Sequence, residues 1–127
     1  IKMKTVKVNL RDRPYKIIIK KNIFASIAAN HFSNYRKSKV IIITDKNVAK
    51  YYIKNFVGFF CKYKFDIQVV VLPSGEKSKD LLVIKKVADK LLKSNVRRND
   101  IIYALGGGVV GDFAGFLASI ILRGIRF

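Results

Sequence analysis

The sequence predicts an α/β domain with a mainly parallel sheet that is covered by helices on both faces. Three runs at residues 40–44, 67–72 and 101–105 are almost continuously apolar and rich in β-branched residues, as parallel strands buried on both faces are. Segments with apolar residues at helical spacing separate these runs. This alternation of strand and helix is typical of a doubly wound, Rossmann-like sheet.

The remaining elements follow from local patterns along the chain. Residues 5–10 and 15–20 flank a turn-forming cluster that contains Pro14, which predicts an N-terminal β-hairpin. Four helices are predicted: from Ile23 to about Phe32, over residues 46–63, from about Leu81 to residue 94, and over residues 109–122. Residues 125–127 read as the start of a further strand.

Length and composition favour one globular domain over residues 1–127. Half of the 127 residues are apolar, yet no uninterrupted apolar run is long enough to span a bilayer, and no secretion signal is present. The single Cys61 excludes an internal disulfide and suits the cytoplasm, and its aromatic neighbours predict a buried thiol. Because both ends look cut, we expect a piece of a larger protein.

The chain is strongly basic, with 26 lysines and arginines against eight acidic residues. Such a charge could attract nucleic acid, anionic lipid or phosphorylated metabolites. The basic residues are scattered, however, and no arginine-rich arm, aromatic RNA-binding pattern or zinc knuckle is present. We therefore expect a solvated lysine-rich surface and neither a nucleic-acid nor a membrane partner.

A glycine-rich turn follows the third strand and is the strongest functional motif. Gly106, Gly108 and Gly111 have the GxGxxG spacing, with a predicted strand before them and a predicted helix after them. Such glycines permit positive φ and remove side chains that would block a pyrophosphate, which the free amides of the first helical turn can bind. A turn that serves packing alone is the alternative.

The ribose partner expected in an ordinary Rossmann layout is missing, because no acidic residue follows Asp112. Asp45, at the end of the first buried strand, could replace it, or could cap the next helix. Residues 74–79 follow the second strand and include Glu76, the only glutamate, and Lys79. They could bind ribose and pyrophosphate, or form a turn and helix cap.

Other polar residues give weaker signals. Asp112 could bond a ribose or a carboxamide, or favour the helix start electrostatically. Arg123 suits phosphate binding, although an arginine at a strand edge is often only solvated. His31 is interpreted as a surface helix residue, and neither a metal site nor a nucleophilic site can be assembled.

These motifs together resemble the 3-dehydroquinate synthase family. The signature is GGGVVGD at residues 106–112 followed by RGIRF at residues 123–127, and residues 43–48 and 73–79 resemble two further segments of the family. The resemblance covers essentially the whole chain. It implies an N-terminal NAD-binding domain and, beyond this chain, a helical domain that carries the metal ligands and most substrate-binding lysines.

The resemblance also implies a reaction of the shikimate pathway. The family uses NAD+ catalytically, with zinc or cobalt, to convert the phosphorylated substrate DAHP to 3-dehydroquinate and phosphate. Alone, the chain would supply no catalytic residue and would be inactive; a homodimer is implied because Arg123 would reach substrate phosphate across an interface. The implied cofactor-binding residues are Asp45, Asn47, Ser74, Gly75, Glu76, Lys77, Ser78, Lys79, Gly107, Gly108, Val109, Val110, Gly111 and Asp112.

Three other functions remain open from the sequence. A related sugar-phosphate cyclase, such as a 2-deoxy-scyllo-inosose or valiolone synthase, would share this domain. A polyol dehydrogenase of the iron-alcohol-dehydrogenase type shares the architecture but fits the signature poorly. A basic nucleic-acid-binding module without catalysis is the non-enzymatic alternative.

Overall fold

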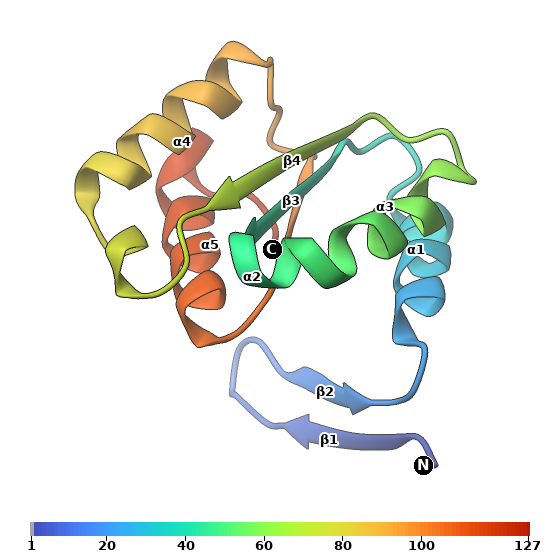
Figure 1. Ribbon diagram of the computed structural model, residues 1–127. Coiled ribbons are helices and arrows are strands. Elements are labelled where there is room, and N and C mark those ends of the chain that lie inside the picture. Colours follow the sequence, from blue (N-terminus) through green and yellow to red (C-terminus); the bar gives the residue numbers. More distant parts are fainter. Residues whose placement is uncertain (1) are drawn as a thin grey trace.

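A three-stranded parallel sheet forms the centre of the computed structural model, which describes residues 2–127 (Figure 1). The strands are β3 (Val40–Asp45), β4 (Ile67–Leu72) and β5 (Ile101–Leu105), in the order β4-β3-β5. The three predicted strands are confirmed, but only β3 is buried on both faces, since Val71 of β4 and Ala104 of β5 are exposed. The predicted fourth strand is only begun, as a single parallel bridge between Ile101 and Arg126.

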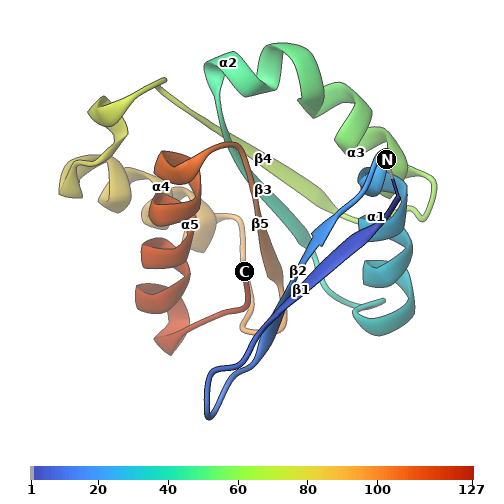
Figure 2. The same ribbon diagram turned by 90° about the horizontal axis from the view of Figure 1, so that it is seen from below.

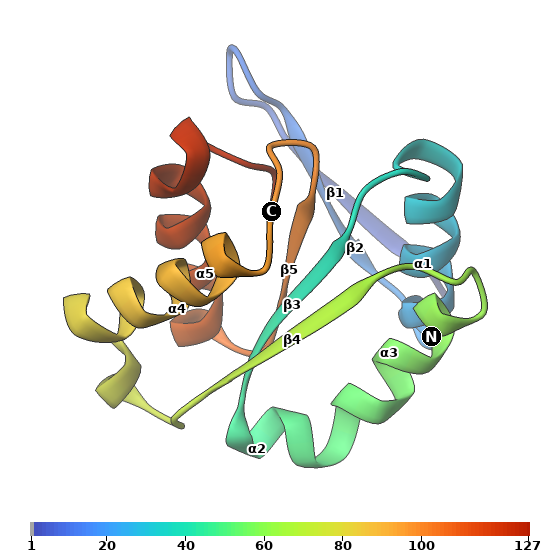
Figure 3. The ribbon, with the colours of Figure 1, turned by 90° about the horizontal axis from the view of Figure 1, so that it is seen from above.

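Helices cover both faces of this sheet, as predicted. On one face lie α1 (Ile23–Asn34) and a continuous helical segment made of α2 (Lys46–Val48), the π-helix η1 (Ala49–Ile53) and α3 (Lys54–Cys61). On the other lie α4 (Leu81–Lys93) and α5 (Gly108–Ile120), with short 3-10 turns at Glu76–Ser78 and Ile121–Arg123. Figures 2 and 3 show the two helical layers on opposite sides of the strands.

Strand β3 is the centre of both cores. Ile41 and Ile43 pack on the α4–α5 side, whereas Val40 and Ile42 pack on the α1–α3 side, and all four are fully buried. Successive side chains of a strand point to opposite faces, so each face of β3 needs apolar residues. This explains the uninterrupted apolar run.

The N-terminal hairpin lies apart from this sandwich of layers. Strands β1 (Lys4–Val8) and β2 (Tyr15–Ile19) pair with each other in an antiparallel ladder, and every residue of β2 is exposed. The hairpin is confirmed, and it forms its own two-stranded sheet (Figure 2).

Two predicted environments are wrong. His31 is fully buried, because it follows Ala28 by three residues and so faces the sheet with it. Cys61 is exposed, because Phe56 and Phe60 occupy the inward face of α3 and the next residue points outward. Short-range composition did not reveal either orientation.

The buried His31 ring has a partner on each nitrogen. Its Nε2 lies 3.2 Å from the carbonyl oxygen of Ser38, and its Nδ1 lies 2.8 Å from the hydroxyl of Tyr103 on β5. Since a carbonyl can only accept, Nε2 carries the proton and the Tyr103 hydroxyl donates to Nδ1. Burial lowers the pKa of His31 and, with a smaller contribution from Tyr35, raises the pKa of Tyr103 to about 12.

This network predicts a loss of stability in mild acid. Because the folded-state pKa of His31 lies below its ordinary value of 6.5, the unfolded chain binds the proton more readily and stability falls as pH drops through that value. The midpoint of thermal unfolding should therefore decrease between pH 7.5 and 5.5. His31 is the only histidine, so His31→Gln should remove most of this decrease. An equal decrease in the variant would contradict the assignment.

Candidate functional site

The carboxyl ends of the three parallel strands are aligned and form one rim of the sheet. Asp45 of β3 pairs in register with Leu72 of β4, and Thr44 pairs with Leu105 of β5. The segments that follow Asp45, Leu72 and Leu105 therefore begin side by side. Ligands of open parallel sheets bind at such rims.

The glycine turn connects β5 to α5 at this rim. Helix α5 begins at Gly108, with Gly107 as its N-cap residue and no side chain as a cap. The amide of Gly111 donates to the carbonyl of Gly107 at 3.0 Å, which closes the first turn. The amides before it have no intrahelical acceptor and remain free to donate, and the pyrophosphate site expected there stays a prediction.

The glycines of this turn serve two different purposes. A Cβ atom on Gly106 would lie 2.7 Å from Cγ2 of Val110, so this glycine allows the turn to pack on α5. A Cβ atom on Gly107, Gly108 or Gly111 would meet nothing within 4 Å. The packing alternative therefore holds for Gly106 only, and the other three leave open space at the helix start.

The glycines of this turn do not use the positive φ that glycine permits. The only glycines with positive φ in the described chain are Gly75 and Gly124. In the glycine turn, Gly107 has φ of −87°, which any residue can adopt. At residues 106–111, glycine is favoured because it leaves space for neighbouring groups, and not because the backbone adopts a conformation that other residues avoid.

Thr44 is a contributor that sequence reasoning missed. Its side chain is fully buried, and its hydroxyl donates to the carbonyl of Leu105 at 2.7 Å. Leu105 is the last residue before the glycine turn, so this bond fixes where the turn leaves the sheet. A lone hydroxyl residue near the end of an apolar strand is the signal that could have identified it.

The second segment, residues 73–79, folds back toward the glycine turn. Gly75 adopts φ of 78°, which favours glycine, and starts the short turn at Glu76–Ser78. The Ser78 hydroxyl is buried and donates to the carbonyl of Gly75 at 3.1 Å. Ser78 thus shapes the loop, and its hydroxyl is already engaged.

Lys79 joins the two segments. Its Nζ lies 3.6 Å from Oε2 of Glu76 and 3.5 Å from Oδ2 of Asp112 on α5. Both carboxylates are largely exposed, so each pair contributes at most about 1 kcal/mol to stability. The structure thus gathers three predicted cofactor residues into one exposed cluster whose stabilising effect is small.

Asp112 lies just beyond the first turn of α5, so the prediction that its charge favours the helix start is wrong.

Asp45 fulfils the structural role considered for it. Its Oδ1 accepts from the amide of Val48 at 2.8 Å and caps the helix that follows β3. Its other carboxylate oxygen makes no hydrogen bond in the described chain, so capping leaves it available. Asn47, two residues later, is exposed on the same helical start.

The helix cap considered for residues 74–79 is supplied instead by Asp80, which accepts from the amide of Leu82 at the start of α4.

The remaining predicted residues differ in what they can offer. Ser74 and Lys77 are exposed on the loop, and Val109 is half-buried. Val110 belongs to the core, so only its backbone could contact a ligand. Arg123 lies beyond the opposite end of α5, so this chain does not bring it to the rim.

The described residues provide no group of three or more histidine, cysteine or acidic side chains that could hold a metal ion. Within residues 2–127, no helix is long and apolar enough to cross a bilayer.

Comparison with known proteins matches the segments that form this rim. The family model described as 3-dehydroquinate synthase N-terminal matches residues 69–127, which contain both the 73–79 segment and the glycine turn. The 3-dehydroquinate synthase of Clostridium kluyveri is 41% identical over 98% of this chain. The chain is thus similar to 3-dehydroquinate synthases over nearly its whole length, and residues 69–127 match the model of their N-terminal part.

Further relatives have a similar sequence identity to this chain. The 3-dehydroquinate synthase of Rhizobium johnstonii is 42% identical over 98% of this chain. The chain spans about a third of the length of these relatives, 35% of the Clostridium kluyveri protein and 33% of the Rhizobium protein.

Solved structures of sugar-phosphate cyclases share the fold. A 2-deoxy-scyllo-inosose synthase, in complex with carbaglucose-6-phosphate, NAD+ and Co2+, matches with a TM-score of 0.83 and 22% identity over 96% of this chain and 33% of its own. The 2-epi-5-epi-valiolone synthase of Streptomyces hygroscopicus, with NAD+ and Zn2+ bound, matches with a TM-score of 0.73 and 21% identity over 94% of this chain and 33% of its own. The predicted Rossmann-like fold is thereby confirmed.

The two kinds of glycine predict opposite effects on stability. Gly106→Ala should lower the free energy of unfolding by about 1–3 kcal/mol, because the added Cβ would collide with Val110. Gly108→Ala, in the first turn of α5 and facing open space, should leave it unchanged or raise it by up to about 1 kcal/mol. Urea unfolding of both variants measures the difference. Equal destabilisation by the two would contradict the separation of roles.

Proposed function

We propose that this chain is the NAD+-binding part of a 3-dehydroquinate synthase. The observation that carries the proposal is the convergence of the two matched segments: Lys79 bonds both Glu76 and Asp112 beside an uncapped, glycine-lined helix start. Identity of 41–42% to 3-dehydroquinate synthases over nearly the whole chain supports the same function.

The residues of the rim fit a dinucleotide. Open space at Gly107, Gly108 and Gly111 would admit the pyrophosphate to the free amides of α5. Lys79 would lie against its negative charge, while Glu76 and the free oxygen of Asp45 would accept ribose hydroxyls. Asn47 would contact the adenosine part and Asp112 the nicotinamide part.

When bound, NAD+ supplies a reversible hydride acceptor, so that a ring hydroxyl of the substrate can become a ketone and later be restored. The part played by this chain is to bind and orient the cofactor. Thr44 and Gly106 hold the turn in place, and Lys79 holds the loop against α5. Proton transfer and ring closure require groups that the described residues do not provide.

A divalent zinc or cobalt ion belongs to the proposed activity but does not fit the residues of this chain. No suitable cluster of ligands exists in the described residues. The complete reaction is therefore proposed only for a protein that also carries the two thirds of the relatives' length outside this alignment.

Arg123 would contact the phosphate of DAHP in a second subunit. It lies beyond the end of α5 at Ile120, and the eight residues from Asp112 to that end already span about 12 Å at 1.5 Å per residue. Arg123 therefore lies away from the rim of its own chain. We propose, from the resemblance to 3-dehydroquinate synthases, a homodimer in which it contacts the partner's substrate.

A related sugar-phosphate cyclase is the second candidate. The likeness to 2-deoxy-scyllo-inosose synthase, with a TM-score of 0.83, favours it, but the identity is only 22%. The higher identity to 3-dehydroquinate synthases supports the first candidate. We place the activity in the cytoplasm, where a free exposed thiol such as Cys61 stays reduced.

Binding of NAD+ tests the proposed cofactor site. The 127-residue chain should bind NAD+ in calorimetry, and Gly108→Val should weaken binding at least tenfold by filling the space for the pyrophosphate. Gly58→Val on α3 is the matched control, since Gly58 is also helical and a Cβ atom there would likewise meet nothing within 4 Å, and it should leave binding intact. Equal affinity of the Gly108 variant and the parent would contradict the site.

The substrate is tested by phosphate release. A protein that joins this chain to the remaining two thirds should release phosphate from DAHP when supplied with NAD+ and Zn2+ or Co2+, whereas the 127-residue chain alone should not. Glucose-6-phosphate serves as the competing substrate for the cyclase alternative. Turnover of glucose-6-phosphate without turnover of DAHP would replace the first candidate by the second.

A further inference from the structure

The turn that follows α5 has an unusual backbone conformation. Leu122 has φ of 49° and ψ of 33°, and Arg123 has φ of 63°, so two consecutive side-chain-bearing residues lie in the left-handed region. A side chain disfavours this region because its Cβ atom approaches the following carbonyl oxygen, and a bulky leucine is an outlier there. Three other non-glycine residues of the described chain have positive φ, and each is isolated: Asn22, Lys64 and Asn95.

The glycine in this turn does not relieve the strain. A helix commonly ends with one left-handed residue, which is usually glycine. Here Gly124, with φ of 105°, comes only after Leu122 and Arg123 have already adopted the disfavoured conformation. Residues in such conformations persist only where their surroundings determine them, and they concentrate at functional sites. The strained pair therefore points to a role for this turn beyond ending the helix.

The conformation of the turn is held by hydrogen bonds to the end of α5. The amide of Gly124 donates to the carbonyl of Ile121, and the amide of Ile125 donates to the carbonyl of Ala118, both at 2.9 Å. These two bonds enclose Leu122 and Arg123 and fold the chain back along the helix. The turn is thus determined by contacts with α5, all of which precede residue 126.

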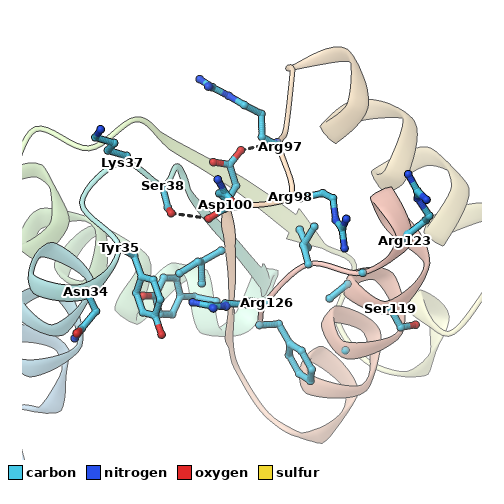
Figure 4. Close-up of a pocket in the computed structure, with 18 of the residues that line it drawn as sticks. Asn34, Tyr35, Lys37, Ser38, Arg97, Arg98, Asp100, Ser119, Arg123 and Arg126 are labelled. Carbon is cyan, nitrogen blue, oxygen red and sulfur yellow. Dashed lines mark hydrogen bonds between the residues drawn. The ribbon is translucent and has the colours of Figure 1, made fainter.

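The two strained residues differ in what their side chains contact. Leu122 is half-buried and packs against the core between α4, α5 and the sheet, whereas Arg123 is exposed. Figure 4 shows Arg123 beside the end of α5, while Arg126 extends away from it toward Tyr35. The core contact of Leu122 therefore anchors the backbone from which the Arg123 side chain projects.

We propose that Leu122 is a positioning residue for Arg123. Its anchored side chain and left-handed backbone fix the direction in which the guanidinium leaves the turn, so that two N–H groups can bond one phosphate. A flexible turn would have to be ordered when substrate binds, which costs affinity. The inference rests on the proposed contact between Arg123 and substrate phosphate, and it adds the residue that directs the arginine.

Glycine substitutions test whether the turn is strained. Arg123→Gly should leave the midpoint of thermal unfolding of the 127-residue chain unchanged or raise it, because glycine accepts φ of 63° without penalty. Arg98→Gly is the control, at an exposed loop residue without positive φ, and should lower the midpoint because glycine makes the unfolded chain more flexible. An equal decrease in both variants would show an unstrained turn and overturn the proposal.

A double-substitution cycle tests the positioning role in the protein that also carries the remaining two thirds. Arg123→Ala should raise the KM for DAHP in phosphate release at least tenfold. Leu122→Gly should raise it at least threefold and leave the NAD+ affinity measured by calorimetry unchanged, whereas Leu122→Met keeps the core contact and should stay within twofold of the parent. Added to Arg123→Ala, Leu122→Gly should have no further effect, because no guanidinium is left to position.

Val83→Gly is the matched control, because Val83 on α4 is also half-buried against the same core. It should lower the midpoint of thermal unfolding, as the loss of an apolar contact does, and leave the KM for DAHP unchanged. Additive effects of Leu122→Gly and Arg123→Ala, or an equal rise in KM with Val83→Gly, would overturn the positioning role alone. An unchanged KM in Arg123→Ala would overturn it together with the proposed phosphate contact.

Discussion

The register of β3 between its two neighbours is the constraint on which the rest of the structure depends. Asp45 is level with Leu72, and Thr44 with Leu105, so three separate segments start from one rim. Hydrogen-bonded parallel ladders to β4 and β5 maintain this alignment, and the buried residues 40–44 are bounded by the polar Lys39 and Asp45, which a shift would draw into the core. Lys79 can reach Asp112 only because the strands before them end together.

The strands and the rim could be predicted from the sequence because their signals are local. The strands at residues 67–72 and 101–105 have the predicted bounds, since polar and turn-forming residues interrupt the apolar runs at both ends. The rule that parallel strands present ligands at their carboxyl ends then selects Asp45, Glu76, Lys79 and Asp112. The last three do meet in space.

Several of the missed features depend on contacts between distant segments. His31 is buried by Tyr103, which lies 72 positions later, and Thr44 bonds a carbonyl 61 positions away. Six arginines scattered between residues 13 and 126 come together only in the folded chain. Spacing along the sequence cannot reveal such pairs. The role of Gly106 was also hidden, because the clash that it avoids involves the side chain of Val110.

The exposed hairpin has a consequence for how the chain behaves in concentrated solution. Ile17, Ile18 and Ile19 each leave about half of their surface in water, on a two-stranded sheet with unpaired outer edges. Such edges invite association between molecules, but lysines along both strands and a net charge of +18 oppose it through repulsion. The excess positive charge therefore acts as a colloidal stabiliser, and salt weakens it by screening.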